Sequence, residues 1–307
     1  MRIWRTTILV ALICLALLVS AARPWRMGTE LLADRFRDSV IFNPGASPGM
    51  RGVAAHKRLA ERHEADGVRT VVVDVPVGEL VVEGSSDPSI GIEAELTGYG
   101  VDTDDARRRL EDITLSVEQQ ERILRITGQI PVTQTRGRSD RMDVTVRVPH
   151  SIAVQTTAGL GNLRVSGIDG DVTAIGRLGK VRVERTRGDI TVRSDLGDVS
   201  VVDVEVQDTL DIYASLGKVH VRGALGRTNR IETATGSVDL EIPESTSLML
   251  DASSSMGKLK TSFPVTGHKE SGMSSGASGQ LGTGTPVGSL FIRVSLGDIS
   301  ISTFPSR

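Results

Sequence analysis

A short pattern, Gly-x-Φ-x-Φ with Φ an aliphatic residue, recurs through the second half of the chain and constrains its fold most strongly. It starts at residue 161, and its glycines follow at steps of 18, 18, 20, 19, 21 and 40 residues. Between successive copies lies another stretch of alternating apolar and polar residues, so each repeat contains two short strands joined by turns. One such unit cannot bury its apolar face alone, whereas a stack of units encloses a continuous core. The sequence therefore predicts an all-β, two-strand-per-coil parallel β-solenoid with coils of about 18–21 residues.

The register of the repeat predicts which side chains are internal. One internal column takes the second residue after each glycine: Val181, Val199, Val219, Val238, Leu259 and Ile299. A second internal column takes the residue before the glycine: Leu160, Leu178, Leu196, Leu216, Met256 and Leu296. Positions between the internal ones face water, among them Arg164, Arg182, Ser200, His220 and Asp239. A β-sandwich also uses short alternating strands, but the regular step favours the solenoid.

The N-terminus carries an uncharged apolar run over residues 6–22, between Arg2 and Arg5 on one side and Arg23 and Arg26 on the other. This order is typical of a secretory signal, and the residues at 19–21 resemble a cleavage site. A run of 17 residues also lies at the lower limit for spanning a bilayer. Residues 1–22 are therefore expected to be a cleaved signal peptide or an uncleaved N-terminal membrane anchor. Either role places the rest of the chain outside the cytoplasm, either membrane-anchored or periplasmic or extracellular.

The remaining chain divides into three parts. Residues 23–68 are rich in charge, with helical runs expected at 28–38 and 52–65, and they are interpreted as a membrane-proximal linker. Residues 69–150 are expected to form an N-terminal β cap, with one short helix that starts at Asp102 or Thr103. The strands of this cap are expected near 70–75, 79–84, 90–96, 113–118, 122–127 and 142–148. Residues 151–307 hold the solenoid repeats, and the Gly- and Ser-rich segment 264–288 is expected to be a flexible surface loop.

The chain contains repeats of the type GDVSV at 197–201, an acidic and basic helical run at 102–112, the motif TSFPV at 261–265 and the final SLFIRVSLGDISIS at 289–302. Together these motifs resemble those of the bacterial putative-adhesin, β-strand-repeat domain family of unknown function. The resemblance covers roughly residues 70–302. It implies a β-solenoid-like fold and an exported or membrane-anchored location, and it supplies no catalytic residues. The chain departs from the family pattern at Lys180, Lys218 and Lys258, where Asp is usual after the glycine.

No motif in the sequence predicts a catalytic, cofactor-binding or metal-binding residue. The turns that contain Asp189 and Asp198 have one glycine each, and Lys180 and Lys218 flank Asp198, which argues against calcium cages. The tripeptide 187–189 spells Arg-Gly-Asp because the repeat itself supplies Gly-Asp, and the Ser-x-x-Lys match at 255–258 lies on a strand rather than a helix. The five histidines are His56, His63, His150, His220 and His268, and they show no zinc-ligand spacing.

Composition narrows the classes of function. The chain has 36 Lys and Arg against 38 Asp and Glu, so no basic excess indicates a nucleic-acid partner. We therefore expect a non-enzymatic cell-envelope protein without a cofactor, whose polar surface binds an unknown envelope protein or polymer. Its membrane contact would be the run 6–22 if that run is not cleaved. One alternative is a structural, polymer-forming β-helix of the envelope. Another is a β-helical enzyme acting on polysaccharides, which would need clustered carboxylates and aromatic residues on one face.

Overall fold

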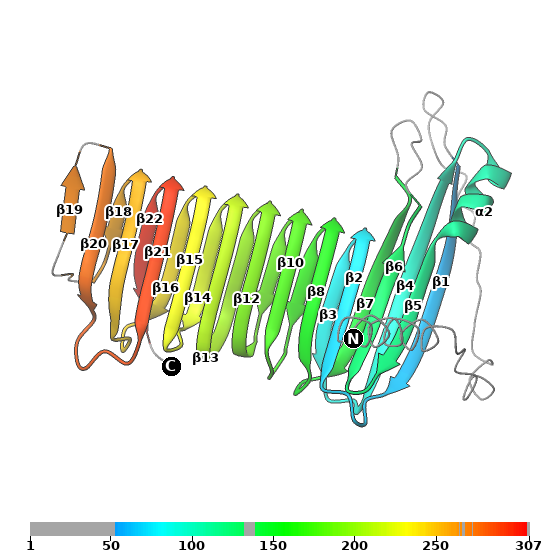
Figure 1. Ribbon diagram of the computed structural model, residues 1–307, viewed down its shortest axis with the longest axis horizontal. Coiled ribbons are helices and arrows are strands. Elements are labelled where there is room, and N and C mark those ends of the chain that lie inside the picture. The colour runs from blue at the N-terminus through cyan, green and yellow to red at the C-terminus, as the bar shows by residue number, and fades with distance from the viewer. Residues whose placement is uncertain (1–52, 132–138, 264, 266–267, 272, 306–307) are drawn as a thin grey trace, which may run out of the picture. The chain divides into compact units, whose positions relative to one another are not determined.

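The structure is a computed structural model that describes residues 53–131, 139–263, 265, 268–271 and 273–305. The expected signal or anchor at 1–22 and the helical run at 28–38 lie outside the described residues. Within the described ranges the protein is all-β apart from one helix, and it has a β-solenoid-like fold (Figure 1). The same ranges contain no helix of sufficient length and hydrophobicity to cross a membrane.

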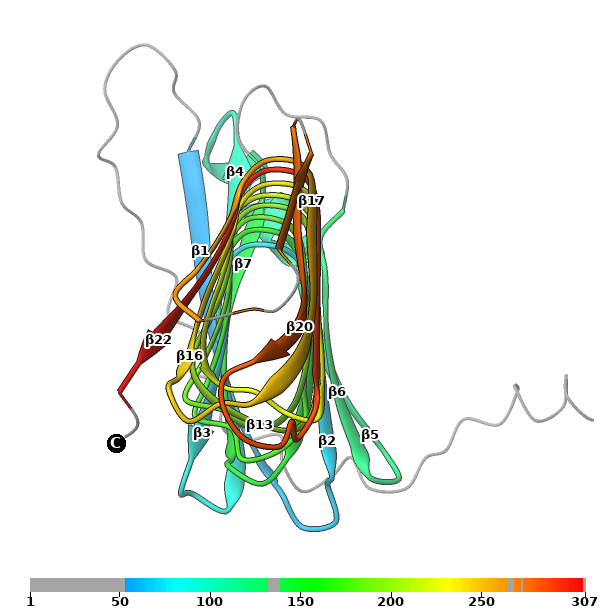
Figure 2. The same cartoon turned by 90° about the vertical axis from the view of Figure 1, so that its left-hand side faces the viewer.

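The strands lie side by side in two stacks that face each other across the core, as the view along the stacks shows (Figure 2). The first stack runs in the order β1 (Val53–Glu64), β4 (Ser89–Gly100), β7 (Arg141–Pro149), β3 (Leu80–Ser85), β9 (Leu163–Ser166), β11 (Val181–Glu184), the first part of β13 (Val199–Leu216), β14 (Val219–Ala224), β16 (Val238–Pro243), β22 (Ile299–Phe304) and β18 (Leu259–Thr261).

The second stack runs beside the first in the same direction. Its order is β5 (Thr114–Gln120), β6 (Ile123–Gln129), β2 (Thr70–Val77), β8 (Ala153–Leu160), β10 (Val172–Leu178), β12 (Arg187–Leu196), the second part of β13, β15 (Thr228–Thr235), β21 (Ser289–Leu296), β17 (Leu248–Met256), β20 (Ser274–Leu281) and β19 (His268–Ser271). Neighbouring strands are parallel from β6 to β17 in this stack and from β7 to β18 in the first. Antiparallel pairs form both ends of the second stack, and the β1, β4 and β7 end of the first.

The core follows from the alternation of side chains along each strand. Val199 pairs with Val181 on one side and with Val219 on the other, and all three are almost completely buried. The first internal column predicted from the repeat is therefore confirmed. Direct stacking of branched side chains from coil to coil removes them from water and supplies the main stabilising contribution.

The second predicted column is wrong, because its residues lie on the surface. Leu196 is 48% exposed, and Leu160, Leu178, Leu216, Leu296 and Met256 are between 41% and 50% exposed. Ser194 still faces inward, but the alternation ends there: both Asp195 and Leu196, the last residue of β12, are exposed, and Leu196 stands where the chain turns toward the opposite stack. The glycine that follows packs closely on the neighbouring coil. A Cβ on Gly197 would lie 2.0 Å from the carbonyl oxygen of Gly179 in that coil.

The coils do not stack in chain order at the C-terminal end. Strands β21 and β22 lie between the coil of β15 and β16 and the coil of β17 and β18, so Ile299 sits between Val238 and Leu259. The segment 264–288, expected to be a surface loop, instead contributes β19 and β20. β20 pairs antiparallel with β17 at the end of the stack. Because the hairpin of β19 and β20 occupies the outer edge of β17, β21 and β22 lie on the inner side of the coil of β17 and β18.

The N-terminal end needs one correction. The helix expected over 52–65 is wrong, because Val53–Glu64 forms β1 and pairs antiparallel with β4 along its whole length. The part of the expected linker from Val53 onward is thus an edge strand of the folded domain. All six strands predicted between residues 70 and 148 are confirmed.

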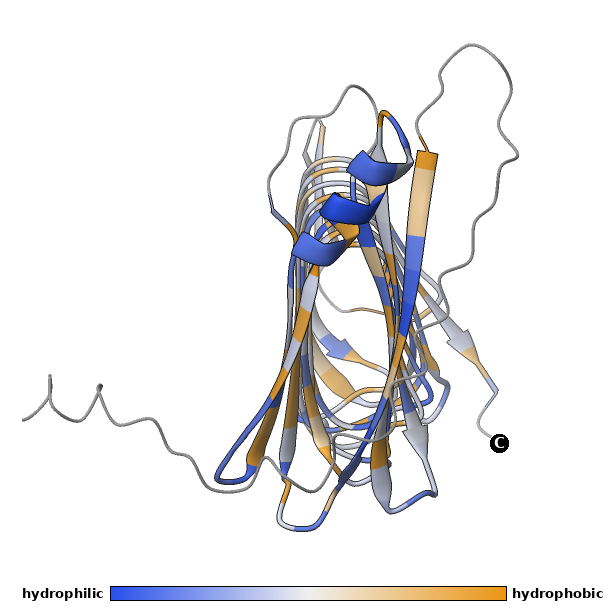
Figure 3. Ribbon diagram, turned by 90° about the vertical axis from the view of Figure 1, so that its right-hand side faces the viewer, coloured by the Kyte–Doolittle hydropathy of each residue, from blue (hydrophilic) through white to orange (hydrophobic). Residues whose placement is uncertain are grey.

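The predicted helix is also confirmed and closes this end of the stacks. Helix α2 (Thr103–Asp112) starts after Asp102, whose carboxylate accepts a hydrogen bond from the backbone N–H of Asp105 at 2.8 Å. Its buried residues Ala106 and Leu110 pack on β4, where Gly98 lets the helix backbone approach closely. The opposite, hydrophilic side of α2 faces away from the strands (Figure 3).

Candidate functional site

A continuous row of polar side chains runs along the outer face of the first stack. The β register places Arg164 beside Arg182, then Ser200, His220 and Asp239 in consecutive coils. None of the five is buried, so the prediction that they face water is confirmed. We call this row the polar ladder. Neighbouring positions in it are about 4.8 Å apart, which brings side chains from residues far apart in sequence into one surface.

Three arginines at one end of the ladder converge on a single carboxylate. The Nε of Arg182 donates to Oε2 of Glu184 at 2.6 Å, and the Nε of Arg164 donates to Oε1 at 2.9 Å. The Nη1 of Arg185 donates to Oε1 at 3.3 Å. The side chain of Glu184 is only 5% exposed, whereas the three arginine side chains are 48–60% exposed. We call this group the arginine cluster.

The cluster has an excess of positive charge at the surface. Burial alone would raise the pKa of Glu184, but the hydrogen bonds and charges of Arg182 and Arg164 outweigh it and hold that pKa below its ordinary value. Glu184 is therefore ionised at neutral pH and compensates one of three positive charges. The guanidinium groups keep donors directed to solvent, and such groups bind carboxylates and phosphates well.

The other end of the ladder is balanced in charge. Lys218 forms an ion pair with Asp239, and this carboxylate raises the pKa of the Lys218 ammonium. Arg222 pairs with Glu241 at 3.6 Å and lies over the ring of Phe304, 5.0 Å from its centroid. The excess positive charge of the ladder therefore lies at the arginine cluster.

The charged residues after the turn glycines are neighbours, as the repeat predicts. The backbone N–H of Val181 donates to the carbonyl of Asp198 at 2.9 Å, and Val199 donates to that of Lys218 at 2.8 Å. The carboxylate of Asp198 accepts a hydrogen bond from the backbone N–H of Lys218 at 3.1 Å. Asp198 thus joins two coils, and no calcium cage is needed to explain it.

The Arg-Gly-Asp tripeptide is part of the coil contacts. Arg187 donates to Glu205 at 2.7 Å, and this pairing raises the pKa of Arg187. The carboxylate of Asp189 accepts from the backbone N–H groups of Asp208 and Thr209, both at 3.0 Å. These contacts give both charged residues of the tripeptide a structural role.

The Ser-x-x-Lys match and the histidines do not come together into a site. The backbone N–H of Lys258 donates to Asp298 at 2.7 Å within a turn of the stack. His56 and His63 share a strand rather than a helix, and their odd separation directs them to opposite faces. His150 contacts the carbonyl of Gly167 at 2.6 Å. The structure groups no His, Cys, Asp and Glu side chains as a metal site within its described ranges.

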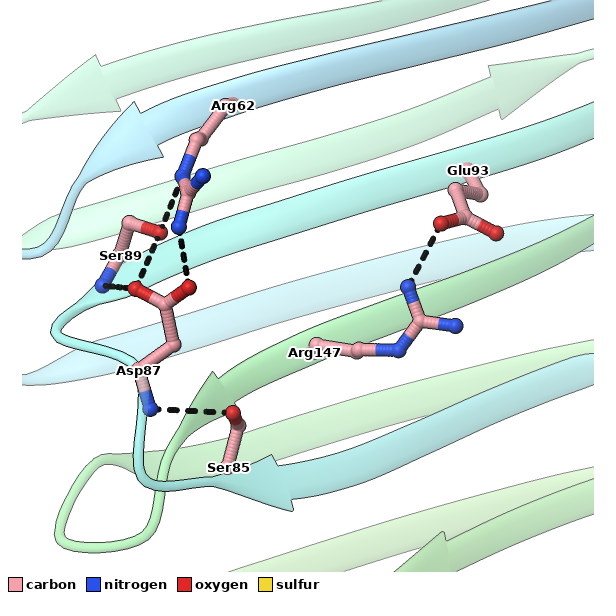
Figure 4. A network of polar contacts seen from close by, with 6 residues as sticks. All are labelled: Arg62, Ser85, Asp87, Ser89, Glu93 and Arg147. Carbon is pink, nitrogen blue, oxygen red and sulfur yellow. Dashed lines mark hydrogen bonds and ion pairs between the residues drawn. The ribbon is translucent and has the colours of Figure 1, made fainter.

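A second polar network, at the turn between β3 and β4, holds the edge strand β1 (Figure 4). The carboxylate of Asp87 accepts from the hydroxyl of Ser89 at 2.9 Å and pairs with Arg62 of β1. Hydrogen bonds from the Ser89 hydroxyl and N–H, followed by those from Arg62, hold the pKa of Asp87 below its usual range. Nearby, Arg147 donates to Glu93 at 2.6 Å. Each charge here has an opposite partner: Arg62 and Asp87 join β1 to the turn, and Arg147 and Glu93 join β7 to β4.

Sequence reasoning found the ladder but missed the cluster. Glu184 and Arg185 follow a strand that the repeat predicts correctly, but no pattern shows that the Glu184 side chain is buried. The one available signal was the direct neighbourhood of Arg164 and Arg182. Two stacked arginines require a counter-charge, and Glu184 is the acidic residue nearest to them in sequence.

Comparison with known proteins gives a family match. The model of the Toastrack DUF4097 family matches residues 70–302. A search of curated proteins gives no match.

Solved structures also match. A putative cell adhesion protein from Clostridium sporogenes is 12% identical over 81% of this chain and 100% of its own, with a TM-score of 0.37. A putative adhesin from Bacteroides fragilis has the same identity and TM-score over 81% and 97%. A putative lipid binding protein from Parabacteroides distasonis is 10% identical over 80% and 96%, with a TM-score of 0.33.

Proposed function

The chain belongs to the Toastrack DUF4097 family, and from this premise we propose that it is an exported, non-enzymatic protein of the cell envelope. In this proposal a two-strand-per-coil parallel β-solenoid presents the polar ladder to another envelope component. The observation that carries the proposal is the arginine cluster, where three half-exposed arginine side chains share one buried carboxylate.

The chemistry of the cluster favours an anionic partner. Arginines that are already held by one buried carboxylate lose little conformational freedom when they bind a second anion, so less of the binding energy is lost to ordering them. Carboxylate or phosphate groups spaced along a polymer or a protein surface match a row of charges at strand spacing. Export is supported by the basic and apolar pattern of residues 1–26.

The ends of the stacks argue against the polymer-forming alternative. Helix α2 packs on β4 and β1 at one end. At the other end the hairpin of β19 and β20 covers β17, and β18 has only three residues. Short or covered edge strands are the usual way in which proteins prevent end-to-end pairing. The polysaccharide-acting alternative has no observation in its favour among the described residues.

Binding is tested with the detergent-solubilised full chain and two probes, polyglutamate for carboxylates and polyphosphate for phosphates. Arg182→Ala should weaken binding to the preferred probe about tenfold, which corresponds to ~1.4 kcal/mol. Arg222→Ala is the matched control, because Arg222 has similar exposure but is balanced by Glu241. Equal effects of the two substitutions, or no binding of either probe at low salt, would refute the proposed surface.

Export needs its own test. Alkaline phosphatase folds only in an oxidising compartment, so its fusion after residue 307 should be active in cells. Deletion of residues 1–22 should abolish that activity. An inactive fusion of the intact chain, present at normal level, would contradict export while leaving the binding test unaffected.

A further inference from the structure

The leucines on the crests of the turns form a continuous apolar ridge. In the order of the stacked coils it consists of Leu160, Leu178, Leu196, Leu216, Thr235, Leu296, Met256 and Met273. Met273 precedes β20, and its carbonyl accepts from Gly257 N–H at 3.0 Å. Met273 is 76% exposed, and the other apolar members are 41–50% exposed. Six strand spacings of about 4.8 Å separate Leu178 from Met273, a length of about 29 Å.

A row of charges accompanies the ridge on the side of the first stack. Two residues after each crest residue from Leu178 to Met256, in coil order, stand Lys180, Asp198, Lys218, Ser237, Asp298 and Lys258. This order holds because Val238 donates to the carbonyl of Asp298, and Ile299 to that of Lys258, both at 2.9 Å. The charges read positive, negative, positive, neutral, negative, positive.

Reversal of this row about Ser237 brings opposite charges together at the four charged positions nearest to it. A two-fold axis through the central coil brings Lys218 of one copy to Asp298 of another and Asp198 to Lys258. Lys180 lies opposite the coil of Met273, where the corresponding residue is the uncharged Ser275. The same axis passes beside Thr235, the single polar break in the ridge, and pairs Leu216 with Leu296, Leu196 with Met256 and Leu178 with Met273. The apolar pairs and the charge pairs thus have the same centre, which is the requirement for an isologous contact, and Leu160 lies outside the overlap.

The parallel arrangement of two ridges is unfavourable. It would bring the side of the first stack in one copy against the side of the second stack in the other. Lys180 would then oppose Arg177, and Asp198 would oppose Asp195, so both contacts would join like charges. Charge therefore selects the antiparallel arrangement.

We propose that the apolar ridge binds a second copy of this chain, antiparallel and centred on Thr235. The contact is narrow: an overlap about 29 Å long and about 10 Å wide covers roughly 300 Å² on each copy. Stable interfaces cover about 800 Å² per partner, so the dimer is weak in dilute solution. It forms where copies are concentrated, as on a shared surface.

Cysteine crosslinking in intact cells tests this contact whatever compartment the protein occupies, so its result is independent of the export proposal. In a Cys14→Ser background, Thr235→Cys should be crosslinked to a dimer by a short bismaleimide. Leu178→Cys alone should not be crosslinked, because the two copies of that position lie about 29 Å apart. Leu178→Cys combined with Met273→Cys should again give a dimer. Circular dichroism of each purified variant verifies that it is folded.

A charge substitution provides the second arm. Lys258→Glu, introduced with Thr235→Cys, opposes Asp198 of the other copy and should lower the dimer yield at least threefold. Lys260→Glu makes the same charge change two residues away on the outer face of β18 and should leave the yield unchanged.

Three outcomes would overturn the proposal. A folded Thr235→Cys variant without dimer shows that the ridges do not meet. A dimer from Leu178→Cys alone shows a parallel contact. Protection of Thr235→Cys from a water-soluble maleimide, without a dimer, shows that lipid covers the ridge instead.

Discussion

Replacement of Gly197 by alanine probes the contact between successive coils most sharply. Gly197 has φ 143°, a backbone conformation that residues with a side chain rarely adopt. A Cβ there would lie 2.0 Å from the carbonyl oxygen of Gly179, so the two coils must separate by about an ångström. Gly67→Ala is the matched control, because Gly67 has φ 77° and nothing lies within 4 Å of its Cβ position.

The expected losses differ by several kcal/mol. Backbone strain at Gly197 costs about 1–3 kcal/mol. Separation of the coils also breaks the hydrogen bonds from Gly179 N–H to Leu196 and from Val181 N–H to Asp198, both 2.9 Å, at about 1 kcal/mol each. After the smaller chain entropy of unfolded alanine is deducted, Gly197→Ala should cost about 3–4 kcal/mol and Gly67→Ala about 1 kcal/mol.

Urea unfolding followed by far-ultraviolet circular dichroism measures both losses. Tryptophan fluorescence is unsuitable, because both tryptophans precede residue 53. If Gly197→Ala unfolds at the same urea concentration as Gly67→Ala, the coils do not touch at this turn and the reasoning is refuted.

Three further predictions concern the same coils. Val199→Asp places a charge at a position that is 1% exposed and should lower stability by at least 3 kcal/mol or prevent folding, whereas Ser200→Asp should change stability little. Equal urea midpoints for the two variants would mean that the strand register is wrong. Asp198→Lys puts three ammonium groups in a row and removes the acceptor for Lys218 N–H, so thermal melting at low salt should show a loss of about 1–2 kcal/mol, and high salt should reduce that loss. If the variant melts like the parent at low salt, Lys180, Asp198 and Lys218 are not neighbours. The pKa of Glu184 in the folded protein is lowered from 4.5, so its ionised form stabilises the fold above that value, and this stabilisation is lost as the pH falls through the folded pKa. The difference in unfolding free energy between the parent and Glu184→Gln should therefore shrink on acidification. A difference that grows would contradict the lowered pKa.

Local periodicity was sufficient to predict the internal column and the six strands of the N-terminal cap. The alternation around Val199 repeats in each coil, and the cap of α2 at Asp102 depends only on neighbouring residues. Both features arise from interactions within a few residues or between adjacent copies of one repeat, which the sequence displays directly.

Local periodicity did not predict where each strand ends at a turn or in which order the last coils stack. Leu196 continues the alternation of its strand, yet it is exposed because the turn starts before the next inward position. The insertion of β21 and β22 depends on which free strand edge the chain meets after β20, and the repeat pattern is compatible with either order. The burial of Glu184 likewise depends on Arg164, which the neighbouring coil supplies.

The order of the coils decides which side chains are neighbours in the polar ladder and along the ridge. Disulfide formation in a Cys14→Ser background tests that order directly. Ser300 lies beside Asp239, about 5 Å away, whereas Lys260 lies two strands from Asp239, about 10 Å away and beyond disulfide reach. Oxidation should therefore close a disulfide in Asp239→Cys with Ser300→Cys and leave Asp239→Cys with Lys260→Cys open. The opposite result would show that the coils stack in chain order and would contradict the neighbours described for both surfaces.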